Sequence, residues 1–123
     1  MHKRKILHVI MLMIGIVTIF SCQYEKIMID APDPTVPVSY SGDLQPIWDK
    51  SCVGCHGTGG TSPDLTPANS YNALFAGGFV DTLSPQTSII YTCMMPGGSM
   101  ASFTNANEAG LVLNWITQGA KNN

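Results

Sequence analysis

The hydrophobic positions in the second half of the chain recur at spacings of three and four, the period of an amphipathic helix. The first such stretch runs over residues 44–52, and Asp43 or Ser41 can cap its start. Pro46 falls in its first turn, where a missing N–H is tolerated. The apolar face of this predicted helix consists of Leu44, Ile47, Trp48 and Cys52.

Three further helices are predicted along the chain. Residues 67–75 form one, ended by the glycine pair at 77–78, and residues 84–91 form another with Pro85 at the favoured first position. The last covers residues 106–118, where Asn105 and Glu108 have the spacing of a capping box. Its apolar stripe is Leu111, Val112, Trp115 and Ile116, and Gly119 ends it. Without alternating strands or repeats, the fold class expected is all-α with long loops.

The N-terminus has the pattern of an export signal. Residues 1–5 are basic, and residues 6–20 form an apolar run shorter than the roughly 20 residues of a membrane span. The run ends in Ile19-Phe20-Ser21-Cys22, which resembles the lipobox of bacterial lipoproteins. We therefore expect residues 1–21 to be a lipoprotein signal peptide and Cys22 to carry lipid, with an uncleaved anchor as the alternative. Either places the rest of the chain in the cell envelope, facing the periplasm.

The mature chain divides into a spacer and one domain. Residues 22–40 contain Pro32, Pro34 and Pro37 without helical or alternating periodicity, which favours an extended tether. Residues 41–123 form a domain of some 80 residues, a size at which a hydrophobic core is marginal by itself.

The net charge of the mature chain limits the classes of partner that it can bind. Without the signal, three lysines stand against eight acidic residues, a net charge of −5. Nucleic-acid binding requires clusters of Lys and Arg that are absent here, so no nucleic-acid partner is expected. A redox partner with a basic docking patch is the expected complement.

The sequence Cys52-Val53-Gly54-Cys55-His56 is the C-x-x-C-H pattern of a c-type haem attachment site. Thiols three positions apart lie on one face of a helical turn, so both can reach the vinyl groups on one edge of a porphyrin. His56 then meets the iron from one side. Export agrees with this prediction, since haem c is attached outside the inner membrane. One covalent haem c per chain would also supply the missing core.

The histidine inventory limits the other iron ligand. His2 and His8 lie in the signal, which leaves His56 as the single histidine of the mature chain. Bis-histidine ligation is therefore excluded, and a Ser-His-Asp triad or a His/carboxylate metal centre would have to take His56 from the motif. The sixth iron position goes to a methionine, a lysine or an outside ligand, or stays open.

Residues 93–100 are predicted to form a loop that contains three methionines. Met95 directly precedes Pro96, which fixes the loop and keeps the preceding residue extended. Met95 is therefore the expected distal ligand. Met100, Met94 and an open site remain alternatives.

Other interpretations of these residues are weaker. A Cys₃His zinc site would need three cysteines and one histidine, which Cys52, Cys55, Cys93 and His56 could supply in number. Side chains of adjacent residues such as Cys55 and His56 rarely bind the same tetrahedral ion. A thioredoxin-like redox pair needs βαβ surroundings that the pattern lacks. The glycine-rich residues 57–60 lack the lysine and the preceding strand of a phosphate-binding loop. The remaining thiol, Cys93, is expected to be buried and inert, with an intermolecular disulfide as the alternative.

Three motifs together carry a resemblance to a family. The residues at 52–57, Met95-Pro96-Gly97-Gly98 and Trp115-Ile116 with Gly119-Ala120 resemble the class I cytochrome c domain of small monohaem bacterial lipoproteins. That resemblance implies three to five helices around a covalent haem, with the helices over residues 44–52 and 106–118 packed together. It also implies that the Pro63 carbonyl orients the His56 ring, with Pro67 as the competing residue.

The expected function is one-electron transfer by a membrane-anchored monohaem c-type cytochrome, with thioether bonds at Cys52 and Cys55 and His56/Met95 ligation. No catalytic constellation is visible, so the chain is not expected to be an enzyme by itself. The alternatives are a haem-based sensor or small-ligand binder with a weak or open sixth position, and an accessory electron-transfer subunit of a larger oxidoreductase complex.

Overall fold

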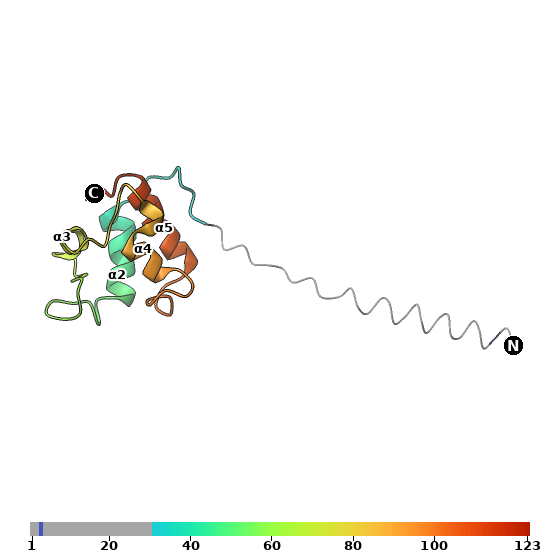
Figure 1. The fold of residues 1–123 in the computed structure, drawn as a ribbon, viewed down its shortest axis with the longest axis horizontal. Helices are drawn as coiled ribbons and strands as arrows, with labels where there is room; N and C mark the ends of the chain where they lie inside the picture. The colour runs from blue at the N-terminus through green and yellow to red at the C-terminus, as the bar shows by residue number, and fades with distance from the viewer. Residues whose placement is uncertain (1–2, 4–30) are drawn as a thin grey trace.

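The structure, a computed structural model, describes Lys3 and residues 31–123. Apart from Lys3, the predicted signal segment lies outside the described residues, and so does Cys22. Within residues 31–123 the fold is helical without strands, which confirms the all-α prediction (Figure 1). The elements are a π-helical turn η2 (Tyr40–Leu44), α2 (Gln45–Ser51), α3 (Ser70–Ala76), a 3₁₀ turn η3 (Pro85–Thr87), α4 (Ile89–Met94) and α5 (Ala106–Thr117). Of the described helices, none has the length and hydrophobicity needed to cross a membrane.

The first helix begins earlier than predicted. Ser39, and neither Ser41 nor Asp43, is the N-cap, because its Oγ accepts the N–H of Gly42 at 3.1 Å. Asp43 instead points back, and its Oδ2 accepts the Ser39 N–H at 2.7 Å. The Ser39 and Asp43 side chains thus satisfy two backbone N–H groups in the first turn. From this turn η2 continues directly into α2.

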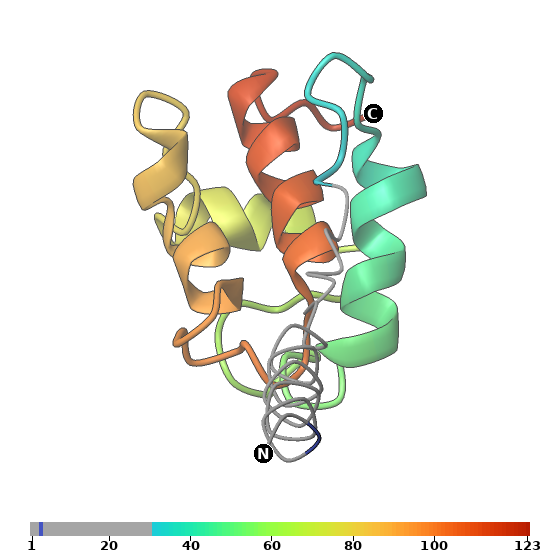
Figure 2. The ribbon, with the colours of Figure 1, turned by 90° about the vertical axis from the view of Figure 1, so that its right-hand side faces the viewer.

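The last helix has the predicted start. The Asn105 side chain accepts the Glu108 N–H and the Glu108 carboxylate accepts the Asn105 N–H, which confirms the capping box. Figure 2 shows α5 beside the helix formed by η2 and α2. The packing predicted between the first and last helices is made by η2, and the Lys50 Nζ at the end of α2 lies 3.6 Å from Glu108 Oε1.

The helix predicted over residues 84–91 is wrong as a single element. It is broken at Ser88, whose ψ of 131° is extended, so η3 precedes the break and α4 follows it. The buried Ser88 hydroxyl donates to the Asp81 carbonyl and accepts the Asp81 N–H, which competes with a continuous helix. At its other end α4 extends to Met94, so Cys93 and Met94 are helical rather than part of the predicted loop.

The core combines the buried faces of these helices with an aromatic cluster. Trp115 of α5 and Tyr40 of η2 have ring centroids 5.1 Å apart, and Tyr40 meets Tyr71 of α3 edge to face at 5.3 Å. Such tilted aromatic pairs add stability beyond the area they bury. The fully buried large side chains are Trp48, Trp115, Leu44, Leu74, Ile116 and Val112.

The described part of the predicted tether lies on α5. Asn114 Nδ2 donates to the Pro32 carbonyl at 3.0 Å, and Gln118 Nε2 donates to the carbonyls of Pro34 and Val36 at 3.1 and 2.9 Å. Gly110 allows this approach, since a Cβ there would stand 2.6 Å from Pro32 Cδ. The chain from Pro32 onward is therefore part of the folded body.

Candidate cofactor site

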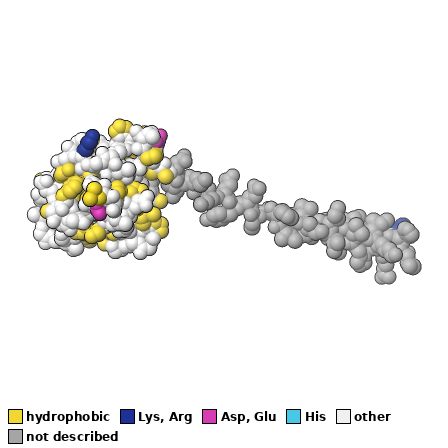
Figure 3. Space-filling view, turned by 45° about the horizontal axis from the view of Figure 1, so that its top comes forward, with side chains coloured by type: hydrophobic (Ala, Val, Ile, Leu, Met, Phe, Trp, Pro, Cys, Tyr) yellow, Lys and Arg dark blue, Asp and Glu magenta, His cyan; other side chains and the backbone are white. Residues whose placement is uncertain are grey.

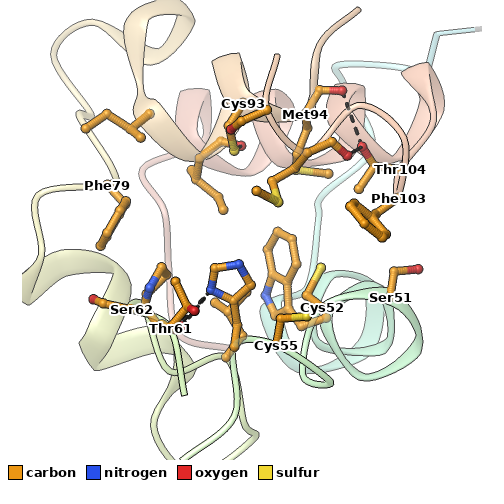
Figure 4. A pocket seen from close by; sticks show the side chains of 18 residues that line it. Ser51, Cys52, Cys55, Thr61, Ser62, Phe79, Cys93, Met94, Phe103 and Thr104 are labelled. Carbon is orange, nitrogen blue, oxygen red and sulfur yellow. Dashed lines mark hydrogen bonds between the residues drawn. The ribbon is translucent and has the colours of Figure 1, made fainter. Parts of the chain in front are cut away.

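One cavity brings together the residues that the sequence singled out for chemistry. It has a volume of about 370 Å³, within the usual range of roughly 300–1,000 Å³ for small-molecule sites. Figure 4 shows Cys52 and Cys55 on one wall, with Cys93 and Met94 on the opposite wall. Trp48, Leu65, Phe79 and Ile90 contribute apolar surface between the walls.

The Cys52–His56 segment continues α2 as tight turns. The Cys52 N–H donates to the Trp48 carbonyl at 2.8 Å, and the Cys52 carbonyl accepts the N–H groups of Cys55 and His56 at 3.1 and 2.8 Å. This local winding places both thiols and the imidazole on the wall of the same cavity, as the helical-turn argument predicts. The three cysteines at 52, 55 and 93 are free thiols.

The His56 ring has a defined orientation and tautomer. Its Nδ1 lies 3.1 Å from the Thr61 carbonyl oxygen and 3.2 Å from the Pro63 carbonyl oxygen. Both neighbours are acceptors, so Nδ1 must carry the proton and donate to them. In the neutral ring the other nitrogen, Nε2, then holds the lone pair that can bind a metal. The Pro63 contact is the one that the resemblance implied, and the Thr61 contact was not anticipated.

Backbone hydrogen bonds join the loop after His56 to the Cys55–His56 backbone at two points. The Leu65 N–H donates to the His56 carbonyl at 2.7 Å, and the Thr61 N–H donates to the Cys55 carbonyl at 2.9 Å. Gly60 is required at this close approach, because a Cβ there would stand 2.5 Å from the Cys55 carbonyl oxygen. These contacts hold the two carbonyl groups that orient the imidazole.

Two polar side chains brace that loop. Gln45 of α2 donates through Nε2 to the Leu65 carbonyl at 3.0 Å and accepts the Ser70 hydroxyl at 2.6 Å. Asp64 accepts the N–H and hydroxyl of Thr66, and these hydrogen bonds lower the pKa of the Asp64 carboxyl to about 2. Gln45 had no role in the sequence prediction, although its buried position on α2 beside Leu44 marks it as a polar residue that needs partners.

The opposite wall is built from the end of α4 and the loop after it. Thr104 Oγ1 lies 3.3 Å from the carbonyls of both Met94 and Met100, which joins the two ends of this loop (Figure 4). Met94 and Met100 line the cavity. Met95, the predicted distal ligand, is half-buried against the core and is not one of the lining residues.

Two of the thiols, those of Cys52 and Cys93, are in surroundings that favour their protonated form. Burial raises the pKa of Cys52 to about 11, and burial also raises the pKa of the Cys93 thiol. A redox or nucleophilic cysteine needs a lowered pKa, so these surroundings do not favour such chemistry. Within the described residues, no three His, Cys, Asp or Glu side chains come together as a metal site.

The cavity wall carries no charged side chain from residues 31–123. Ile89 and Phe103 line it and are also 52% and 59% exposed at the surface, and Leu83, two residues before η3, is 93% exposed. Figure 3 shows hydrophobic side chains gathered across one face of the folded body, with only isolated charged ones among them. An apolar ligand is therefore favoured inside, and apolar contacts are available around it.

These residues fit a covalently attached haem. The donor set is two thiols and an imidazole Nε2 on one wall, with thioether sulfur from methionines on the other and apolar surface between. Ser62, Ser99 and Thr104 are polar residues of the same lining. No family model, curated protein or solved structure matches the chain.

Proposed function

We propose that the protein is a c-type cytochrome with one covalently bound haem, which transfers single electrons between redox partners in the bacterial cell envelope. One observation carries the proposal: the thiols of Cys52 and Cys55 and the imidazole of His56 share one wall of an apolar cavity, with His56 Nδ1 held by two carbonyls. A haem bound there would supply the iron that gains and loses the electron.

The chain itself contributes three things to that function. Cys52 and Cys55 would anchor the macrocycle through thioether bonds, and the hydrogen-bonded His56 would present Nε2 to the iron in a fixed orientation. The apolar wall would exclude water from the macrocycle, which together with a thioether ligand favours a relatively high reduction potential. The class I cytochrome c fold belongs to this proposal, since it is the arrangement in which such helices surround one haem.

The exposed edge of the cavity is the proposed route of the electron to a partner protein. This edge includes the exposed side chains of Ile89 and Phe103. A partner would meet apolar side chains at this edge, while the acidic remainder of the chain would attract a basic docking patch. Lipid on Cys22 would hold the protein at the membrane.

An absorbance and potentiometric titration of the purified full-length protein tests the proposal. The reduced protein should show the sharp α-band of a low-spin haem c, and its reversible oxidation should fit a single one-electron step. A matched set of serine variants separates the cysteines: Cys93→Ser keeps the spectrum, while Cys52→Ser and Cys55→Ser each remove a thioether and change it. A wild-type protein without the α-band, or one that binds carbon monoxide rapidly when reduced, contradicts the proposed electron carrier.

A further inference from the structure

The three methionines between residues 94 and 100 have different relations to the cavity. Met94 and Met100 line it, whereas Met95 packs against the core outside it. Met94 ends α4 and Met95 is its C-cap, and successive residues at a helix end point in different directions. Met95 is therefore not part of the wall that Met94 and Met100 share.

The Met95-Pro96 pair has a structural role of its own. The Gly98 N–H donates to the Met95 carbonyl at 2.8 Å, and Gly97 has a φ of 88°. Proline followed by a residue with positive φ, closed by this hydrogen bond, is the pattern of a type II turn. Gly98 is then packed against the end of α4, since a Cβ there would stand 2.4 Å from the carbonyl oxygens of Thr92 and Cys93. This turn reverses the chain rather than presenting Met95.

The reversed chain delivers Met100 to the cavity. The Met100 N–H donates to the Cys93 carbonyl at 2.8 Å, and the Met100 carbonyl accepts the Phe103 N–H at 3.0 Å and the Thr104 hydroxyl at 3.3 Å. The backbone is therefore held on both sides while the half-buried side chain lines the cavity. Three rotatable bonds let a methionine sulfur adjust to a partner without moving this backbone.

Met94 is less suited to the same role. Its side chain is only 3% exposed and belongs to the hydrophobic core at the end of α4. The Met94 side chain is thus already packed in the core, whereas the Met100 side chain is only half-buried.

We infer that Met100, and not Met95, supplies the thioether opposite His56. The inference rests on the proposed function, because it needs a haem anchored at Cys52 and Cys55. Thioether sulfur is a soft neutral donor that suits haem iron, and the pairing of His56 with Met100 closes the cavity from both sides.

Three single variants of the haem-bearing full-length protein test the assignment: Met94→Leu, Met95→Leu and Met100→Leu. Leucine conserves the volume of methionine, so each variant should keep the fold. In the oxidised wild type, the charge-transfer band of methionine-ligated iron should be present, and Met94→Leu and Met95→Leu should keep it. Met100→Leu should lose this band and, when reduced, should bind carbon monoxide rapidly. Loss of the band in Met95→Leu or Met94→Leu instead overturns the inference.

A second measurement does not depend on the folding of the Met100 variant. In the reduced protein labelled at methionine methyl groups, the methyl of the iron ligand is displaced far upfield in the NMR spectrum by the porphyrin ring current. That displaced signal should persist in Met94→Leu and Met95→Leu, and its disappearance from either contradicts the assignment. Covalent haem with no displaced methionine signal in the wild type refutes this inference alone, whereas a wild type without covalent haem refutes the proposed function.

Discussion

The hydrogen bonds of Gln45 are predicted to determine how firmly the loop that holds His56 is fixed to α2. Gln45 is 8% exposed and Ser70 is completely buried, and the Ser70 hydroxyl donates to Gln45 Oε1. Gln45 Nε2 also donates to Asp49 Oδ1 at 2.8 Å. Gln45 also donates to the Leu65 carbonyl, and the Leu65 N–H in turn donates to the His56 carbonyl. The perturbation we choose is Gln45→Met, which keeps the length of the side chain and removes both hydrogen-bonding atoms.

The expected loss follows from the partners left behind. Gln45→Met leaves the Leu65 carbonyl and the Ser70 hydroxyl without this partner, and each buried unsatisfied group costs about 1–3 kcal/mol. Since methionine recovers some apolar contact, we expect the free energy of unfolding to fall by about 2–4 kcal/mol. Ser70→Ala leaves only the Gln45 carbonyl oxygen unsatisfied and should cost about 1–3 kcal/mol.

The double variant gives the sharper result. With both side chains replaced, the Gln45–Ser70 hydrogen bond is removed together with both of its ends, so the loss should be smaller than the sum of the single losses. We expect a coupling energy of about 1–2 kcal/mol, within the range found for residues in direct contact.

Urea unfolding followed by circular dichroism measures these differences, with Gln86→Met as the matched control. Gln86 is an exposed residue of η3 and should stay within about 0.5 kcal/mol of the wild type. A Gln45→Met variant as stable as this control, or single losses that simply add in the double variant, would refute the reasoning.

Three other regions give independent predictions. Gly60→Ala should lower the unfolding free energy by about 1–3 kcal/mol, because its Cβ would stand 2.5 Å from the Cys55 backbone carbonyl oxygen. Gly54→Ala is the control, since its added Cβ would have no atom within 4 Å, and its unfolding free energy should stay within about 0.5 kcal/mol of the wild type. Equal losses of stability in the two variants, measured by urea unfolding, would contradict this prediction. The folded protein lowers the pKa of Asp64 to about 2, so the contribution of this carboxylate to stability is present above pH 4 and is lost as the pH falls toward 2. Asp64→Asn should therefore weaken the dependence of the urea midpoint on pH in this range. The same pH dependence in the variant and the wild type would count against the prediction. Gly110→Val should displace Pro32 from α5 and speed limited proteolysis within residues 31–38, whereas an unchanged cleavage rate shows that this contact does not hold the segment.

The features that the sequence predicted well are local. The capping box of Asn105 and Glu108 and the apolar stripe of α5 depend on residues three or four positions apart, so periodicity alone identifies them. The shared wall of Cys52, Cys55 and His56 follows from the same short-range geometry.

The features that the sequence did not predict depend on contacts between distant segments or on backbone atoms. The break at Ser88 comes from hydrogen bonds to Asp81, and the docking of Pro32 depends on Gly110 and Asn114 far along the chain. The Thr61 carbonyl that faces His56 is a backbone group, which residue type does not reveal. Long-range pairing of this kind overrides the local preference of each segment.

The methionine loop shows that one sequence pattern, a methionine followed by proline, is compatible with two different local structures. A proline after Met95 is compatible with a presented ligand and equally with the corner of a type II turn. The hydrogen bond from Gly98 to Met95 and the positive φ of Gly97 favour the turn. Met95 as the iron ligand stays a prediction from the sequence, and the spectra of the Met95→Leu and Met100→Leu variants test it against Met100.

The most direct test of the central claim is the intact mass of the denatured protein after export in a bacterium that matures c-type cytochromes. The account predicts that the wild type and Cys93→Ser are heavier than the processed polypeptide by one haem, since thioether bonds survive denaturation. The double variant Cys52→Ser/Cys55→Ser should have the mass of the polypeptide without haem. A wild-type protein without the added mass of haem, produced beside a control cytochrome that carries it, would contradict the account.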